Sequence, residues 1–325
     1  MDHKNVHEDA LRAGNAGALG KSGCVPDHIV TATAADGSIS IAAGITTALV
    51  GDAQRRHGTA PTATAALGRL MTGAALFGAS LKGRERVTLQ ISSDGPLRGI
   101  VADVQLIASK AIGTRGFTNE PAVDLPPNAR GKLDVGGAVG GGRLQVTKSY
   151  EVGRPYVGVV PLVSGEIGDD LASYLANSQQ IPSVVALGVL VNAKGVAVAG
   201  GAVAQVMPGA DERTIAELEA RVRAMPAITA QISAGADARD IARTIAGTIT
   251  LRSFGEYTVQ PWCRCSRDKV ELALLSLGHD ELIDMATHDP QTDATCDFCR
   301  TTYVFSKDEV RELAARAAPA RKSGG

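Results

Sequence analysis

Two short stretches decide how the C-terminal part of this chain folds: WCRCS at residues 262–266 and TCDFC at residues 295–299. Cys263 and Cys265 form a Cys-x-Cys pair, and Cys296 and Cys299 form a Cys-x-x-Cys pair thirty residues further on. Two close cysteine pairs joined by a helix-sized insert are typical of a tetrahedral thiolate site for zinc. The sequence therefore predicts that one zinc ion is bound by Cys263, Cys265, Cys296 and Cys299.

Such a metal would carry much of the stability of the module around it. This module, residues 259–318, has about sixty residues and few aromatic side chains, so its apolar core is thin. Structural zinc contributes on the order of 10–16 kcal/mol of apparent folding free energy. Loss of the metal should therefore unfold the module.

Oxidation of the thiols is one way to lose the metal. The most local disulfides, Cys263–Cys265 and Cys296–Cys299, would expel it, and each closes so small a loop that it adds less than about 2 kcal/mol. They would also leave the two halves of the module unlinked. The site can therefore act as an unfolding switch, while a permanently reduced zinc ribbon and a thiol–disulfide enzyme are the alternatives.

The residues near the cysteines bear on the charge of the site. Four thiolates with one zinc ion carry a net charge of −2. The cations Arg264, Arg267, Lys269 and Arg300 either offset this charge or are solvated surface residues. Because four thiolates complete a zinc site, the histidines are interpreted as surface or hydrogen-bonded residues; they include His57, His279 and His288.

The remaining chain predicts an α+β fold. Strand-like and helix-like patterns alternate without a strict βαβ rhythm, which favours a mixed-sheet core domain with packed helices over a doubly wound sheet. Cys24 is interpreted as a free thiol without a function. The predicted division is a mobile extension (1–26), a core domain (27–208), a metastable helical linker (209–258), a small zinc-binding redox-switch domain (259–318) and a tail (319–325).

Local patterns place several elements of the core. Asp36-Gly37 is a hairpin turn signal before the alternating strand residues Ile39 and Ile41. A helix is predicted to begin near Pro61 and can end at Gly83. The long apolar tract 181–207 is interpreted as two buried strands joined by a turn at Asn192–Gly195, because polar residues and glycines interrupt it.

The linker and the C-terminal module show helical spacing. Ile215, Leu218 and Val222 predict one amphipathic helix, and Ile241 and Ile245 anchor a second, shorter one. Short helices of this kind are marginal alone and need a surface to pack on. Beyond the cysteines, Ser306 followed by Glu309 is a capping box that opens a final helix.

Composition excludes several classes of function. Lys plus Arg is 33 and Asp plus Glu is 34, so a phosphate-neutralising basic surface is not expected, and no nucleic-acid partner is predicted. No secretory signal or membrane span is expected, and clustered cysteines suit a reducing cytoplasm. Nucleophile-elbow, P-loop and dinucleotide motifs do not occur, so an enzyme is not predicted.

The chain resembles the heat-shock protein 33 family of redox-regulated chaperones. The C-terminal match is Cys263-Arg264-Cys265-Ser266-Arg267, then Cys296-Asp297-Phe298-Cys299 and Tyr303-Val304-Phe305. The core adds further matches, which include Arg56-His57 with Pro61, Ala66-Leu67-Gly68-Arg69, Leu81-Lys82-Gly83, Asp94-Gly95-Pro96, Gly165-Glu166-Ile167 and Ile181-Pro182-Ser183. The similarity spans about residues 27–310; the extension 1–24 and the segment His288–Ala294 depart from the family pattern.

The resemblance implies an ATP-independent holdase chaperone. In this family the reduced, zinc-bound monomer is inactive. Peroxide or hypochlorite with mild heat forms the two local disulfides and releases zinc, the linker loses its structure, and apolar surface opens on the core. The oxidised protein then dimerises and holds unfolded or partly folded client proteins. The same roles are expected here, with Cys263, Cys265, Cys296 and Cys299 as both metal ligands and redox cysteines.

Overall fold

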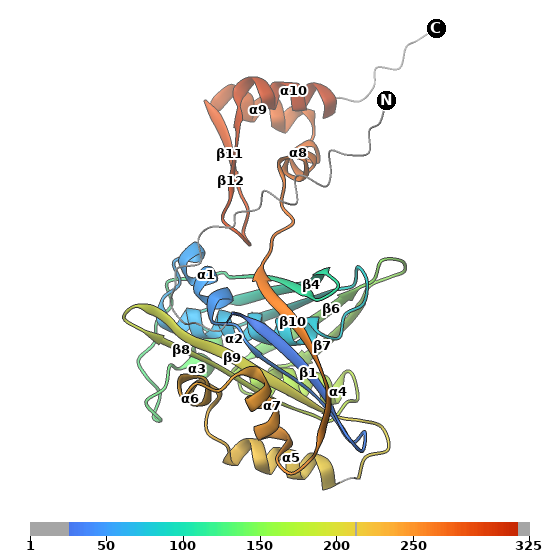
Figure 1. Cartoon of the computed structure of the whole chain (residues 1–325). Helices are drawn as coiled ribbons and strands as arrows, with labels where there is room; N and C mark the ends of the chain where they lie inside the picture. Colours follow the sequence, from blue (N-terminus) through green and yellow to red (C-terminus); the bar gives the residue numbers. More distant parts are fainter. Residues whose placement is uncertain (1–25, 212, 318–325) are drawn as a thin grey trace.

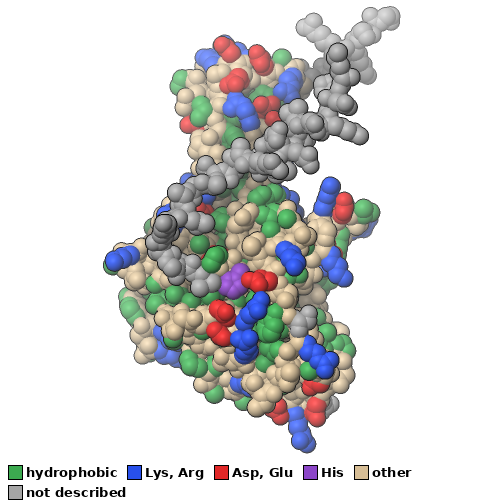
Figure 2. All heavy atoms as spheres, viewed as in Figure 1, with side chains coloured by type: hydrophobic (Ala, Val, Ile, Leu, Met, Phe, Trp, Pro, Cys, Tyr) green, Lys and Arg blue, Asp and Glu red, His purple; other side chains and the backbone are tan. Residues whose placement is uncertain are grey.

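The structure is a computed structural model that describes residues 26–211 and 213–317. A large sheet with helices on both faces forms the main body, and a smaller body built from the residues after Pro261 stands at one end of it (Figure 1). Figure 2 shows acidic and basic side chains mixed over the outside of this smaller body. The predicted tail and residues 1–25 of the predicted extension, with Cys24, lie outside the described residues.

One mixed sheet of ten strands, counted over the described residues, organises the main body, and it confirms the α+β prediction. Its order is β7-β6-β3-β4-β5-β10-β1-β2-β9-β8. Neighbouring strands are antiparallel except β5 and β10, which are parallel. In chain order the strands are β1 (His28–Ala34), β2 (Ile39–Ile45), β3 (Arg86–Ser93), β4 (Gly99–Ala108), β5 (Ala111–Thr118), β6 (Gly142–Ser149), β7 (Tyr156–Pro161), β8 (Ser183–Asn192), β9 (Gly195–Val206) and β10 (Leu251–Pro261).

Two sequence predictions for this sheet are confirmed. Gly37 has a φ of 77°, a value that favours glycine, and it closes the turn between β1 and β2. The apolar tract 181–207 contains β8 and β9, which pair with each other down to Asn192 and Gly195. Within the part of the chain that the structure describes, no helix has both the length and the apolar character needed to cross a membrane.

One face of the sheet packs on α2 (Pro61–Gly78), most of whose residues are buried, and on α1 (Thr47–His57), α3 (Val135–Val139) and α4 (Gly168–Asn177). Helix α2 begins at Pro61 as predicted, but it ends at Gly78 rather than at Gly83. Backbone N–H groups of residues 79–81 bond to carbonyls three residues earlier, which tightens and ends the last turn. Gly83 lies beyond, in the loop that leads to β3.

The other face carries a second apolar cluster under three helices. These are α5 (Arg213–Ala224), α6 (Ile228–Ser233) and α7 (Ala238–Ala246), all within the segment predicted as a helical linker. Leu218, Ile228, Ile241 and Ile245 are buried against side chains of β1, β2, β8 and β9. The segment then ends differently from the prediction: its last residues form β10, which lies in the middle of the sheet between β5 and β1.

The small C-terminal body has its own apolar cluster around Phe305, Leu282 and Leu313. It contains α8 (Arg267–Leu275), α9 (His279–His288), the hairpin of β11 (Gln291–Thr295) and β12 (Thr302–Ser306), and α10 (Lys307–Ala317). The predicted capping box is present. The Ser306 backbone N–H donates to Glu309 at 2.8 Å, and the Glu309 backbone N–H donates to Ser306 Oγ at 3.3 Å. Helix α9 was not predicted from the sequence.

Candidate metal centre

The first cysteine pair leaves the central sheet directly. Pro261 is the last residue of β10, and the Trp262 backbone N–H still donates to the carbonyl of Thr114 on β5, at 3.1 Å. Ser266, just after Cys265, caps α8 by accepting a hydrogen bond from the Lys269 backbone N–H. The pair is thus held between a core strand and the first helix of the small body.

The second pair lies at the tip of the β11–β12 hairpin. The Cys296 backbone N–H donates to the carbonyl of Thr301, and the Arg300 backbone N–H donates back to the carbonyl of Cys296, at 2.9 and 2.8 Å. Arg300 has a φ of 60°, which a non-glycine residue rarely adopts. This tight loop turns both sulfurs of the pair to the same side.

The structure brings all four cysteines together. Their sulfur atoms lie within 4.8 Å of one another, so that they could hold one metal ion. Cys263 Sγ and Cys296 Sγ are 3.8 Å apart, and Cys265 Sγ and Cys299 Sγ are 3.3 Å apart. Zinc–sulfur bonds of about 2.3 Å in a tetrahedron place the sulfurs about 3.8 Å apart. The size of the cluster and its all-thiol donor set therefore fit a zinc ion.

Without a metal the four thiols would not ionise alike. Burial raises the pKa of Cys265 to about 12 and also raises that of Cys296. Burial acts in the same direction on Cys299, but hydrogen bonds with Thr301, Cys265 and Cys263 together outweigh it and lower the pKa of Cys299 to about 7. Binding of a metal ion to all four sulfurs would therefore release protons.

The hairpin tip rests on the main body through Phe298. Its ring meets that of Phe117 edge to face with 5.0 Å between centroids. The guanidinium carbon of Arg115 lies 3.9 Å from the centre of the Phe298 ring, a cation–π contact. Nε2 of His57 lies 3.1 Å from the Phe298 carbonyl oxygen. Sequence reasoning missed this contact, since nothing in a single sequence relates Phe298 to β5 or α1.

The cation that touches a sulfur was also missed. Arg115 on β5 donates from Nη1 to Cys263 Sγ at 3.2 Å, across 148 residues of chain. Three of the four predicted cations bond elsewhere: Arg264 pairs with Asp103 at 3.6 Å, Arg267 pairs with Glu309, and Lys269 donates to the Arg264 carbonyl. Burial, and next the positive charge of Arg86, lower the pKa of Arg264.

The histidines behave as predicted, because each uses a ring nitrogen on a backbone carbonyl. The partners are Phe298 for His57, Ala314 for His279 and Asp284 for His288.

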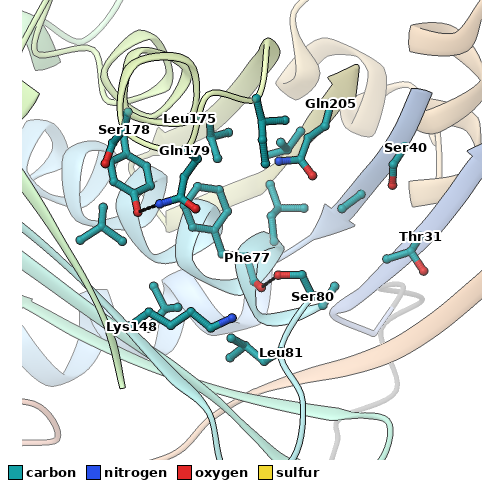
Figure 3. A pocket seen from close by; sticks show the side chains of 18 of the residues that line it. Thr31, Ser40, Phe77, Ser80, Leu81, Lys148, Leu175, Ser178, Gln179 and Gln205 are labelled. Carbon is teal, nitrogen blue, oxygen red and sulfur yellow. Dashed lines mark hydrogen bonds between the residues drawn. The ribbon is translucent and has the colours of Figure 1, made fainter. Parts of the chain in front are cut away.

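Two cavities open on the main body, one of them beside the cysteines. One of about 290 Å³ opens beside the cysteines and is lined by Cys263, Cys265 and Cys299 together with His57 and Arg115. A larger groove of about 790 Å³ is lined by residues of β1, β2 and β9 and by residues of β3, β6 and β7 (Figure 3). Its lining includes Phe77, Tyr150, Tyr156 and Tyr174, four of the few aromatic side chains of the chain. Gln179 donates to the Tyr174 hydroxyl there, at 2.9 Å.

Comparison with known proteins identifies similar chains. A family model described as "Hsp33 protein" matches residues 27–306. The "33 kDa chaperonin" of Acaryochloris marina is 45% identical over 291 residues, covering 88% of this chain and 96% of the relative, and that of Nostoc punctiforme is 45% identical over 293 residues, covering 89% and 96%. The crystal structure of the 33 kDa chaperonin (heat shock protein 33 homolog) of Thermotoga maritima superposes with a TM-score of 0.83 at 35% identity, covering 90% of this chain and 99% of that one.

Proposed function

This chain belongs to the Hsp33 family, and from that membership and its four-cysteine site we propose that it is a redox-regulated, ATP-independent holdase chaperone. The observation that carries the proposal is the gathering of all four sulfurs within 4.8 Å of one another, from two local pairs on separate arms of the chain. One arm leaves the core sheet, and the other is the hairpin of the small body. A bond between the arms holds the body together, and bonds within each arm do not.

In the reduced state, Cys263, Cys265, Cys296 and Cys299 hold one zinc ion. When bound, zinc supplies a cross-link between the arms worth on the order of 10 kcal/mol. The apolar cluster around Phe305 is small, so that this cross-link decides whether the body is folded. Phe298 and Arg115 keep the folded site seated on the main body.

Oxidation converts the links between arms into links within them. The cavity beside Cys263, Cys265 and Cys299 lets a small oxidant such as peroxide reach the sulfurs. Two thiolates lose two electrons as an S–S bond forms, and one hydrogen peroxide molecule accepts these with two protons to give two waters. We assign the bonds to Cys263–Cys265 and Cys296–Cys299, because the sulfurs of each pair are tethered through only one or two intervening residues.

The linker helices are the next part to respond. They bury Leu218, Ile228, Ile241 and Ile245 on the sheet face of β1, β2, β8 and β9, and the strand β10 joins them to Cys263. Short helices keep their structure only while they are packed. When β10 loses its anchor in the small body, the helices come away and apolar side chains of this sheet face become available.

The exposed sheet face would hold unfolded or partly folded client proteins through apolar contact, without nucleotide. Such a face is larger than the apolar patches that a monomer leaves in water, which favours a homodimer of the oxidised form and a monomer of the reduced form. A reducing cytoplasm is the compartment that would keep the site loaded until oxidative stress occurs.

The test starts from reduced, zinc-loaded protein treated with peroxide at mild heat. Zinc release is followed with a chromogenic chelator, and aggregation of a heat-denatured model protein is followed by light scattering. We expect both to rise together and a thiol reductant to reverse the protection. Zinc release without protection from aggregation would leave a structural zinc site and refute the chaperone assignment.

A further inference from the structure

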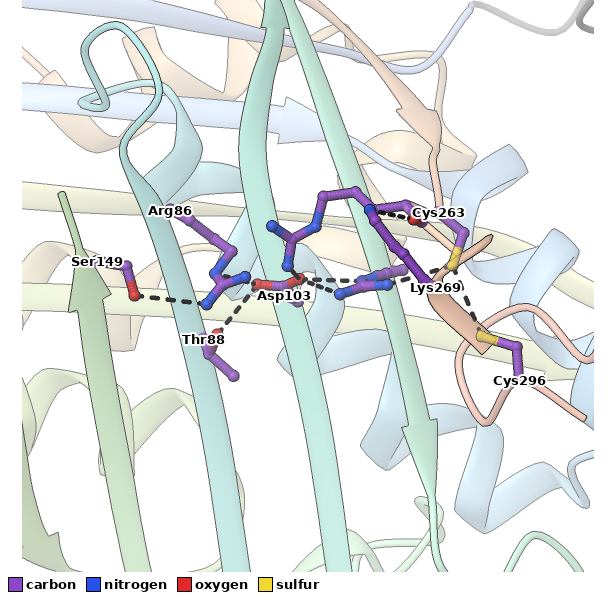
Figure 4. A network of polar contacts seen from close by, with 9 residues as sticks. Arg86, Thr88, Asp103, Ser149, Cys263, Lys269 and Cys296 are labelled. Atoms are coloured by element: carbon purple, nitrogen blue, oxygen red, sulfur yellow. Dashed lines mark hydrogen bonds and ion pairs between the residues drawn. The ribbon is translucent and has the colours of Figure 1, made fainter. Parts of the chain in front are cut away.

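A partly buried cluster of arginines around one aspartate runs across β3, β4 and β5 to the cysteines (Figure 4). Its centre is Asp103 on β4, which is only 5% exposed. Arg115 stands opposite Asp103 on β5 and donates to Oδ2 from Nε and Nη2 at 2.9 and 2.8 Å. Thr88 donates to Oδ1 from the other neighbouring strand, at 3.0 Å. The carboxylate is thus fixed in the sheet on both sides.

Two more guanidinium groups crowd the same carboxylate. Arg86 lies 3.5 Å from Oδ1, and Arg264, which stands between the two cysteines of the first pair, lies 3.6 Å from Oδ2. Asp103 does not accept hydrogen bonds from all three guanidinium groups. Nε of Arg86 and Nε of Arg264 are buried and have no hydrogen-bond partner among the described residues. Three positive charges therefore share one negative charge, which leaves an excess of two positive charges.

The cysteine site supplies the charge that is missing. Four thiolates with one zinc ion carry a net charge of −2, and Arg115 donates to Cys263 Sγ from the same guanidinium that holds Asp103. The thiolate site and the arginine cluster together are neutral. Once the thiolates have become disulfides and the ion has left, the site is uncharged and the arginine cluster keeps its excess.

We propose that Arg115, with Arg86 and Arg264, makes the docking of the cysteine site on the core depend on the charge of its sulfurs. This inference rests on the proposed function, from which it takes the oxidation of the four cysteines. In the reduced state Arg115 is a positioning residue that ties Cys263 to Asp103. In the oxidised state the uncompensated arginines disfavour the docked arrangement, because partly buried like charges interact far more strongly than exposed ones. Charge thus adds to the unfolding that metal loss causes.

The test compares variants that break the same ion pair but change the charge in opposite directions. Arg86→Gln removes one positive charge from the cluster, and Asp103→Asn removes its negative charge. A merely structural role for the Arg86–Asp103 pair would shift docking the same way in both. A role through charge would shift the docking equilibrium in opposite directions in Arg86→Gln and Asp103→Asn. Arg86→Lys keeps the charge, and Arg84→Gln makes the same change in net charge at an 84% exposed side chain.

Fluorescence of Trp262, the only tryptophan of the chain, can report whether the cysteine site is docked on the core. Trp262 directly precedes Cys263, and its backbone N–H donates to the carbonyl of Thr114 on β5. Emission of Trp262 and amide exchange of residues 296–301 give the ratio of docked to undocked protein after oxidation and zinc release. We expect Arg86→Gln to raise this ratio about tenfold and Asp103→Asn to lower it about tenfold, the size of one removed charge contact. High salt should reduce both effects.

The outcomes separate this inference from the proposed function. If the parent protein keeps the Trp262 emission of its reduced form after both disulfides have formed, the proposed switch itself fails. If it undocks but the ratio moves the same way in both charge variants, or Arg86→Lys behaves as Arg86→Gln, only the charge inference is overturned. Should Asp103→Asn fail to fold, Arg264→Gln against Arg264→Lys repeats the Arg86→Gln against Arg86→Lys comparison at the other arginine whose Nε has no hydrogen-bond partner within the described part of the chain: only the loss of the charge should raise the ratio.

Discussion

Replacement of Ile241 by alanine should loosen the linker helices without touching the cysteines. Ile241 lies on α7, is fully buried, and packs on the side chains of β1 and β2. Removing a buried isoleucine side chain down to its β-carbon costs roughly 2–5 kcal/mol. This loss falls on a layer of three short helices that have little stability of their own. The reduced, zinc-loaded variant should therefore expose the sheet face part of the time.

We expect Ile241→Ala to suppress client aggregation before any oxidant is added, while its zinc content stays that of the parent protein. Amide exchange should rise over α5, α6 and α7 and remain unchanged over β3 and β4. The matched control is Ile100→Ala on β4, which is equally buried but belongs to the cluster on the opposite face. If both variants become active when reduced, general unfolding is responsible. If the linker helices exchange freely and the reduced variant stays inactive, the sheet face beneath them is not the client surface.

Three further predictions concern the small body and the core. A strong chelator should unfold residues 262–317 while the sheet stays intact, and limited proteolysis should then cut only in that segment and the linker; cuts inside β3–β6 would contradict this. Ser306→Ala should destabilise the small body by about 1 kcal/mol through loss of the capping box, measured as release of zinc at a lower peroxide concentration. Burial raises the pKa of Asp27 to about 6, above its ordinary value of 3.8, so the folded protein binds this proton more tightly than the unfolded chain does. The free energy of unfolding should therefore gain up to about 3 kcal/mol from this group as pH falls from about 6 towards 4, and urea titrations between about pH 4 and 7 should show a flatter pH dependence of that free energy for Asp27→Asn.

Short-range signals in the sequence were sufficient for much of the fold. The turn at Gly37, the start of α2 at Pro61 and the capping box at Ser306 each depend on residues within a few positions of one another. The cysteine cluster was predicted for the same reason, because two close pairs fix the local geometry on each arm. Its assembly into one site needed only that the arms meet.

Long-range pairing could not be predicted in this way. Strand β10 carries Arg252, Glu256 and Thr258, so that its apolar alternation is weak, and its partners β1 and β5 lie far away in the sequence. Its place in the sheet comes from hydrogen bonds with both neighbours rather than from its own propensity. The contact of Arg115 with Cys263 is of the same kind, since no local pattern relates a residue of β5 to a cysteine 148 positions away.

In the proposed switch, the place of β10 would connect the metal site to the linker. The strand has the last linker helix before its first residue and the first cysteine pair just after its last one. Its parallel pairing with β5 involves only Thr258 to Pro261, next to the cysteines, whereas its pairing with β1 runs back as far as Leu251. Loss of the Trp262 and Cys263 contacts would therefore weaken the β5 side first, and the strain would reach α7 along the β1 side. A cysteine site attached anywhere but at the end of a central strand would lack this direct path to the helices that cover the sheet.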